Sequence, residues 1–341
     1  MQDTMNDPTQ IRSIAQELSD LEVAILLCRA AHGHCRIDTA RDNISDVAKE
    51  LALICSNTFN LSYNILDCSA GTTFDEFCVE LLPSIARRRS ISSKVAPELP
   101  IVDVVIATNF DHADERIQLQ ALELMRSKKL VTQDGIYVAP ERFVFLPLVT
   151  STTNNAQPKL NRHLNDHLII SHYHDAEDGY VYLEDDNGWI SDDQMSASSV
   201  VRKFDIPVAR EHPLVNLAAV EKLEETASAV MVSADLIRYH QDIVVFLRLN
   251  RAVAGGISAR SNILFMKLSK FLAALHGIDY LTPSIVALAA KKVFRHRIVV
   301  ADTEDDRSLQ YGSDPAAVAQ ILAHANPDTI LESVLALEAP L

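Results

Sequence analysis

Four histidines form the densest group of side chains that could do chemistry: His163, His167, His172 and His174. Since His172 and His174 are two positions apart, they lie on the same side of an extended strand, and imidazole is a common ligand of zinc. Nothing in the sequence fixes a third ligand. We therefore expect no metal site here and interpret the histidines as polar surface residues near a strand edge.

A second group, His32-Gly33-His34-Cys35, places three soft ligands within four residues, and we again expect no metal. The five cysteines all lie in the first 80 residues, and their odd number and spacing do not match a small disulfide scaffold. This pattern indicates buried thiols in a reducing compartment. They are Cys28, Cys35, Cys55, Cys68 and Cys78.

The sequence lacks the loop that most often binds nucleoside triphosphates. Such a loop needs glycines whose backbone N–H groups wrap the phosphates, a lysine for the β and γ phosphates, and a hydroxyl for Mg²⁺. No Gly-x-x-x-x-Gly-Lys-Ser/Thr sequence occurs anywhere in the 341 residues. We therefore expect that the isolated chain does not hydrolyse ATP.

The hydrophobic pattern of the first half predicts strands alternating with helices, which is typical of an α/β layer fold. A Ser-x-x-Glu capping box at Ser19–Glu22 begins the first helix. The nearly continuous apolar run 101–107 is typical of a strand buried on both faces of a parallel sheet. An Asp-Gly pair within 132–137 predicts a hairpin. Further strands are expected at 35–37, 61–66 and 143–146, and helices at 45–54, 73–85 and 113–128.

The second half predicts helices only, from Pro213 onward, with a sharp break at 253–256. The helix from Ala259 to His276 should end at Gly277. The next helix should begin with Thr282 as its N-cap and Pro283 in its first turn.

Residues 255–298, from Gly-Gly-Ile-Ser-Ala-Arg-Ser to Arg-His-Arg-Ile, resemble the helical lid of magnesium chelatase subunit I and MoxR AAA+ ATPases. That family has a Gly-Ala-Ser-Pro-Arg turn, a helix of small and apolar residues, a Gly-Arg-x-x-Val-x-Pro turn and a closing His-Arg. Ile257, Ala259 and Ile278 depart from the pattern, but the spacing is kept. In the first half, 104–107 resembles the family's Walker B strand and Gly33-His34 the start of its P-loop strand.

The resemblance implies an α/β fold with a parallel-sheet AAA+ core followed by an all-helical lid, in a divergent, fungal-type member with degenerate Walker motifs. We expect an N-terminal arm at 1–18, a core at 19–214 with a solvated acidic loop at 175–193, a lid at 215–305 and a helical tail at 306–341. The acidic loop, with interleaved tyrosines and Trp189, is a candidate docking segment.

The resemblance also identifies nine positions of a nucleotide site: Thr39, Ile44, Ser45, Asp46, Thr108, Asn109, Thr150, His167 and Arg260. The P-loop stretch 39–46 has lost its glycines and lysine and carries two carboxylates. Thr108-Asn109 replaces the Walker B Asp-Glu pair. Thr150 stands at the sensor-one position. His167 stands at the arginine-finger position, where it lacks the permanent charge and planar fork of a guanidinium.

Only Arg260, at the sensor-two position, keeps the family's residue type. We expect it to pair with a core carboxylate such as Asp42 or Asp46 in place of a phosphate. These departures lead us to expect no catalytic residue, no metal ligand and no bound cofactor. ATP and Mg²⁺ would be required only if the chain were active.

Charge argues against nucleic acid or anionic lipid as a partner of the whole chain, because 31 basic and 46 acidic residues give a net charge of −15. Residues 231–300 are an exception, with ten basic and three acidic residues, or +7. Aromatic residues are sparse there, which disfavours a base-stacking surface. The polar N-terminus and the absence of a long apolar run predict neither a signal peptide nor a membrane span, hence an intracellular, cytoplasmic protein.

Three functions follow as hypotheses. The first is a module without ATPase activity, a scaffold or the inactive member of an assembly, with a protein partner or a homo- or hetero-oligomer. The second is an active ATPase or chelatase-type subunit that completes its site with a neighbour's residues. The third, based on the histidines and the basic segment, is a metal- or nucleic-acid-binding protein.

Overall fold

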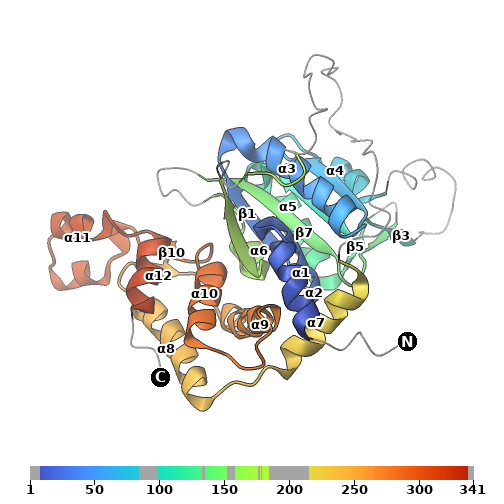
Figure 1. Ribbon diagram of the computed structural model, residues 1–341. Helices are drawn as coiled ribbons and strands as arrows, with labels where there is room; N and C mark the ends of the chain where they lie inside the picture. The colour runs from blue at the N-terminus through green and yellow to red at the C-terminus, as the bar shows by residue number, and fades with distance from the viewer. Residues whose placement is uncertain are drawn as a thin grey trace. The chain divides into compact units, whose positions relative to one another are not determined.

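A computed structural model describes residues 8–83, 98–132, 135–151, 158–175, 177, 179–183 and 215–336. The chain forms two compact units, Glu17–Val220 and Glu221–Leu341, the latter together with Met1–Gln16 (Figure 1). No helix in the described part is both long and apolar enough to cross a bilayer.

The first unit is built on a five-stranded parallel sheet with strand order β2-β4-β7-β1-β8. Because every strand runs in the same direction, all five carboxyl ends lie along one edge. Thr39, the last residue of β1, is paired with Thr150 of β7 on one side and His174 of β8 on the other. The strands are β1 (Cys35–Thr39), β2 (Tyr63–Asp67), β4 (Val104–Thr108), β7 (Val144–Thr150) and β8 (Ile170–His174).

Helices cover both faces of this sheet. Two pack against the central strands from one face, α2 (Asp20–Ala30) and α3 (Ile44–Leu53), and α3 continues into a π-helical turn, η2 (Ile54–Thr58). On the other face lie α4 (Phe74–Leu81), α5 (Glu115–Ser127) and α6 (Arg162–His167). The predicted capping box is confirmed, because Ser19 and Glu22 each accept the other's backbone N–H.

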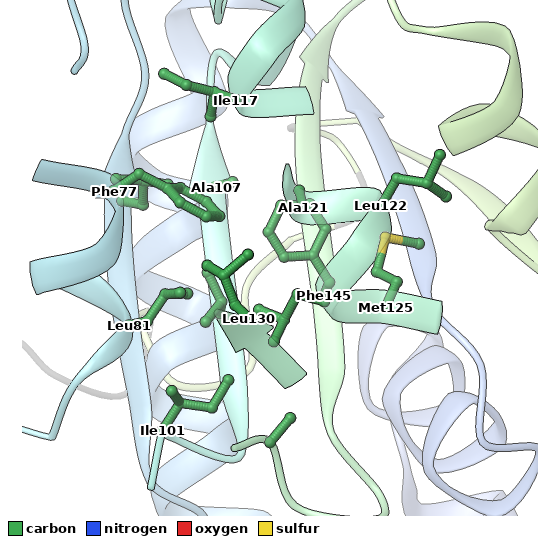
Figure 2. Packing of buried hydrophobic residues seen from close by; sticks show 14 of the residues in the cluster. Phe77, Leu81, Ile101, Ala107, Ile117, Ala121, Leu122, Met125, Leu130 and Phe145 are labelled. Atoms are coloured by element: carbon green, nitrogen blue, oxygen red, sulfur yellow. The ribbon is translucent and has the colours of Figure 1, made fainter. Parts of the chain in front are cut away.

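The main apolar core lies between the sheet and helices α4 and α5 (Figure 2). Phe77 of α4, Ala121 of α5 and Phe145 of β7 are fully buried in it. All five residues of β4 are buried, which confirms that this strand is enclosed on both faces. Burial of one such phenylalanine contributes about 1.5–3 kcal/mol to the hydrophobic free energy of folding.

A smaller sheet of order β3-β6-β5 adjoins this core, with β3 (Glu98–Pro100), β5 (Lys129–Val131) and β6 (Ile136–Val138). Strands β5 and β6 are antiparallel, as the Asp-Gly pair predicted. The strand expected from residue 101 begins only at Val104, because Ile101 donates its N–H to Val138 of the smaller sheet at 3.1 Å. Two short 3₁₀ turns, η1 (Arg41–Asn43) and η4 (Phe110–His112), follow β1 and β4.

The second unit is largely helical. It contains α1 (Pro8–Glu17), the end of α7 (Leu217–Ala229), α8 (Ala234–Leu249), α9 (Ala259–Leu275), α10 (Pro283–Phe294), η7 (Thr303–Asp305), η8 (Arg307–Tyr311), α11 (Pro315–Leu322) and α12 (Pro327–Leu335). Helix α10 packs against α8, α9 and α12. Helix α9 ends before Gly277, and the Thr282 hydroxyl caps α10 with Pro283 in its first turn, both as predicted.

The prediction that everything after Pro213 is helical is wrong at one place. The break at 253–256 forms a short strand, β9 (Val253–Gly255), which pairs antiparallel with β10 (Val299–Val300). Gly256 has φ +97°, and a Cβ there would lie 1.7 Å from the carbonyl oxygen of Arg297. Only glycine permits this approach, so Gly256 lets the segments that follow α8 and α10 come together rather than merely ending a helix.

A buried histidine in this unit makes the folding stability depend on pH. His240 of α8 stacks on Phe265 of α9 with ring centroids 4.0 Å apart, and neither ring nitrogen has a hydrogen-bond partner among the described residues. Burial lowers the pKa of His240 from 6.5 to about 4. The unfolded chain therefore takes up a proton before the folded one does, so stability falls as the pH drops from 6.5 towards about 4.

We predict that His240→Phe raises the free energy of unfolding by about 1–2 kcal/mol, because it removes two unsatisfied buried nitrogens and keeps the ring stack. It should also weaken the acid-side loss of stability. Thermal melting between pH 4 and pH 7 tests this, with the exposed His276→Phe as the control. A variant that melts below its parent across this range would contradict the prediction.

Candidate nucleotide site

The connection between β1 and α3 is where a P-loop would lie, and its backbone is not shaped to bind phosphate. Residues 40–43 join the strand to the helix through the 3₁₀ turn η1, and Asn43 donates its N–H to Ala40 at 3.0 Å. Across residues 39–46, all of which are described, no residue has a positive φ. A phosphate-binding nest needs successive N–H groups that converge on one point. Residues 39–46 have neither the glycines and lysine of a P-loop nor the positive φ angles of a nest.

Most side chains around this connection bond to or pack against other groups of the protein. Thr39 donates its hydroxyl to the carbonyl of His174 at 2.9 Å. Ile44 is buried at the start of α3, whereas Ser45 is exposed. Asp46 pairs with Lys49 at 3.1 Å, and this partly exposed pair contributes at most about 1 kcal/mol. The group at the start of α3 is thus a carboxylate, which repels phosphate.

The two Walker B positions fix a turn. Thr108 donates its hydroxyl to Asp67 Oδ1 at 2.8 Å, and Asn109 donates its side-chain N–H to the same oxygen at 3.3 Å. Asn109 is left-handed with φ 51°, a conformation that asparagine tolerates. Asp67, at the end of β2, was not among the predicted site residues. Its position directly after an apolar strand was the signal that could have found it.

Two more carboxylates lie near this edge. Oδ1 of Asp38 in β1 accepts two hydrogen bonds from Arg36, at 2.9 Å from Nε and 2.5 Å from Nη2. Asp111 in η4 is largely buried, which raises its pKa, and nearby Arg36 opposes that shift. No group of three histidine, cysteine or acidic side chains among the described residues could hold a metal ion.

The structure brings seven of the nine predicted positions to the carboxyl edge: Thr39, Ile44, Ser45, Asp46, Thr108, Asn109 and Thr150. Thr150 lies opposite Thr39, and its buried hydroxyl has no hydrogen-bond partner among the described residues. His167 lies elsewhere. It ends α6 just before β8, where Ile169 donates its N–H to His34, so it lies at the amino edge of the same sheet.

Arg260 is the second residue of α9 and belongs to the other unit. Its pairing with Asp42 or Asp46 stays a prediction.

The interpretation of His172 and His174 as surface residues is wrong. They lie on the edge strand β8, as expected, but are only 5 % and 4 % exposed. The ring of Tyr180 contacts that of His174 in a tilted arrangement, with ring centroids 5.3 Å apart, and α2 packs on this strand. His34 is also buried, and its Nδ1 accepts the N–H of Phe145 at 3.0 Å. Burial lowers the pKa of His34 to about 3, so it is neutral and structural.

The acidic segment 175–193 was expected to be a solvated loop. Asp175 and Glu177 are exposed as expected, but the stretch that follows them packs on the core unit. Tyr182 is buried, and residues 181–183 donate backbone N–H groups to Glu50 of α3. Residues 184–193, including Trp189, lie outside the described residues. The five cysteines are buried and free, as predicted.

Comparison with known proteins agrees with this architecture. The family model of the AAA lid domain matches residues 246–321, a span that contains the segment recognised from its sequence. A crystal structure from Cytophaga hutchinsonii, of a protein named "putative ATPase", superposes with a TM-score of 0.60 at 15 % identity, covering 98 % of this chain and 97 % of that one. The chain has the AAA+ fold. The AAA+ core is the parallel-sheet unit, and its lid is the helical unit.

Two curated relatives share part of the sequence. The protein named "Maintenance of telomere capping protein 2" in Lachancea thermotolerans is 32 % identical over 112 residues, covering 31 % of this chain and 39 % of that protein. Its namesake in Kluyveromyces lactis is 28 % identical over 104 residues, covering 29 % and 38 %. The match thus spans about two fifths of each relative.

We predict that Asp67 is a structural acceptor in this AAA+ core rather than a catalytic carboxylate. Asp67→Ala should lower the free energy of unfolding by about 1–2 kcal/mol, because Thr108 and Asn109 lose their shared acceptor. Chemical denaturation measures this, with the exposed Asp42→Ala as the control for loss of one negative charge. Equal stability of the two variants would show that the shared acceptor does not stabilise the turn.

Proposed function

We propose that this chain is an AAA+ module of the magnesium chelatase and MoxR type that neither binds nor hydrolyses nucleotide, and that it acts through protein contacts as a scaffold or inactive member of an assembly. The observation that carries the proposal is the connection from β1 to α3. Its N–H groups do not form a nest, and the first turn of α3 carries Asp46. A phosphate is held at a helix start by N–H groups that converge in a nest and by a lysine at the P-loop position; here the N–H groups form no nest and Ser45 stands at the lysine position.

An active ATPase completed by a neighbouring subunit is less well supported. A neighbour can supply an arginine to a nucleotide, but it cannot supply the phosphate cradle, which is backbone of the chain that binds. A metal- or nucleic-acid-binding function also loses support. Two of the four clustered histidines are buried. Four of the six aromatic side chains in the basic segment 231–300 are also buried, which leaves Phe246 and Tyr280 as its exposed rings for stacking.

The names of the curated relatives suggest where such a module could work. They are named for the maintenance of telomere capping, and we propose that this chain likewise serves a multiprotein assembly inside the cell. Telomeres are chromosome ends, so this would extend its site of action from the expected cytoplasm to the nucleus.

The proposal predicts that the purified full chain shows no saturable binding of ATP or ADP below about millimolar concentration, with or without Mg²⁺, because the cradle is missing. Isothermal titration calorimetry measures this. Inorganic phosphate serves as a second ligand, because it separates a surviving phosphate site from binding through the nucleoside alone. A micromolar dissociation constant for either nucleotide would overturn the loss of nucleotide binding.

A further inference from the structure

Two buried carboxylates in the core unit take no part in the nucleotide positions. Glu22 of α2 is 2 % exposed and Glu50 of α3 is 1 % exposed, and Thr58 in the π-helical turn η2 is fully buried beside them. An ionised carboxylate buried without partners costs several kcal/mol, so each must be satisfied by the protein. Both accept hydrogen bonds from a segment more than 120 positions away along the chain.

Glu50 is satisfied by three consecutive backbone N–H groups. Val181 donates to Oε1 at 3.0 Å, Tyr182 to Oε1 at 3.2 Å and Leu183 to Oε2 at 3.2 Å. Successive amides that converge on one anion form a nest, and hydrogen bonds to a charged acceptor are about twice as strong as neutral ones. Burial raises the pKa of Glu50, and these three amides oppose that shift.

The side chain of Tyr182 makes a second contact at the far end of α3. Its hydroxyl lies 2.6 Å from Thr58 Oγ1 and donates to Glu22 Oε1 at 3.3 Å. Thr58 itself donates to Glu22 Oε1 at 2.5 Å, and the other Glu22 oxygen accepts the N–H of Ser19 that caps α2. The contact therefore joins α2, the end of α3 and Tyr182 in one buried network.

Tyr180 places the same segment beside the degenerate site. Its ring lies tilted against that of His174, which ends β8 next to Thr39. Burial raises its pKa, and the carboxylates of Asp46 and Glu50 add to this. Figure 1 shows the segment as a short yellow-green stretch beside α3. Residues 179–183 thus follow α3 from its first turn to its end.

We propose that Glu50 is a built-in anionic ligand for the amides of residues 181–183, and that this contact latches the segment 179–183 along α3, beside the first turn that a nucleotide site would use. The segment is called the latch below. In the latch, the protein's own carboxylate fills the anion nest that the three amides form. When Glu50 is removed, the three amides become a vacant site for a carboxylate. The latch does not depend on whether nucleotide binds.

Hydrogen exchange of the full chain tests the latch. In Glu50→Ala and Glu50→Gln, the amides of Val181, Tyr182 and Leu183 should exchange at least about tenfold faster than in the parent, while the amides of β4 keep their protection. Glu123→Ala, an exposed carboxylate on α5, removes the same charge and should leave these amides at the parental rate. Parental exchange of the three amides in both Glu50 variants would overturn the proposal.

Acetate separates an anion nest from general loosening of the fold. In Glu50→Ala, sodium acetate should slow the exchange of the three amides towards the parental rate, and sodium chloride at equal ionic strength should not. If acetate and chloride act alike, the nest is not an anion site and the proposal fails.

If Glu50→Ala also exposes β4, Glu50→Gln decides, because it keeps the size of the side chain and removes the negative charge that the three amides meet. Faster exchange of the latch amides with protected β4 then supports the latch, and parental exchange overturns it. Calorimetry with ATP on the parent tests the proposed function separately, so one idea can fail without the other.

Discussion

The structure depends on what the backbone N–H groups at the carboxyl edge of the sheet bind. In a parallel sheet every strand delivers its carboxyl end to one edge, and a helix that follows a strand presents free N–H groups there. A nucleotide-binding protein leaves those groups available to phosphate. Here the 3₁₀ turn after β1 consumes the N–H of Asn43 internally, and Asp46 follows in the first turn of α3. On the proposed function, the scaffold is kept and the phosphate site is lost.

The same core satisfies an anion elsewhere, with groups of its own. Glu50 lies one turn further along α3 than Asp46 and receives three amides from residues 181–183. Breaking such a buried contact by removing one partner costs more than the contact contributes, because the remaining group stays buried. Residues 179–183 carry no acidic side chain, and their backbone N–H groups meet Glu50, so this part of the acidic segment can lie along α3.

Local features of the fold could be predicted from the sequence, and long-range ones could not. The Ser19 capping box, the Thr282-Pro283 helix start and the buried strand β4 each depend on neighbouring residues. Strand β10 has two residues and pairs with a segment more than 40 positions away, so no periodicity marks it. Glu50 carries no sequence signal either, because its partners are backbone groups more than 130 positions distant. The lid was recognised from the spacing of its residues. Asp67, whose carboxylate accepts the hydroxyl of Thr108, was not recognised.

The central claim, that the β1–α3 connection offers no phosphate site, is tested most directly by amide hydrogen exchange of residues 40–46 with and without saturating Mg²⁺–ADP. A nucleotide whose phosphates bind there must contact these amides and slow their exchange. The account predicts identical exchange of Asn43, Ile44, Ser45 and Asp46 in the two conditions. Saturable protection of these amides by ADP would contradict it.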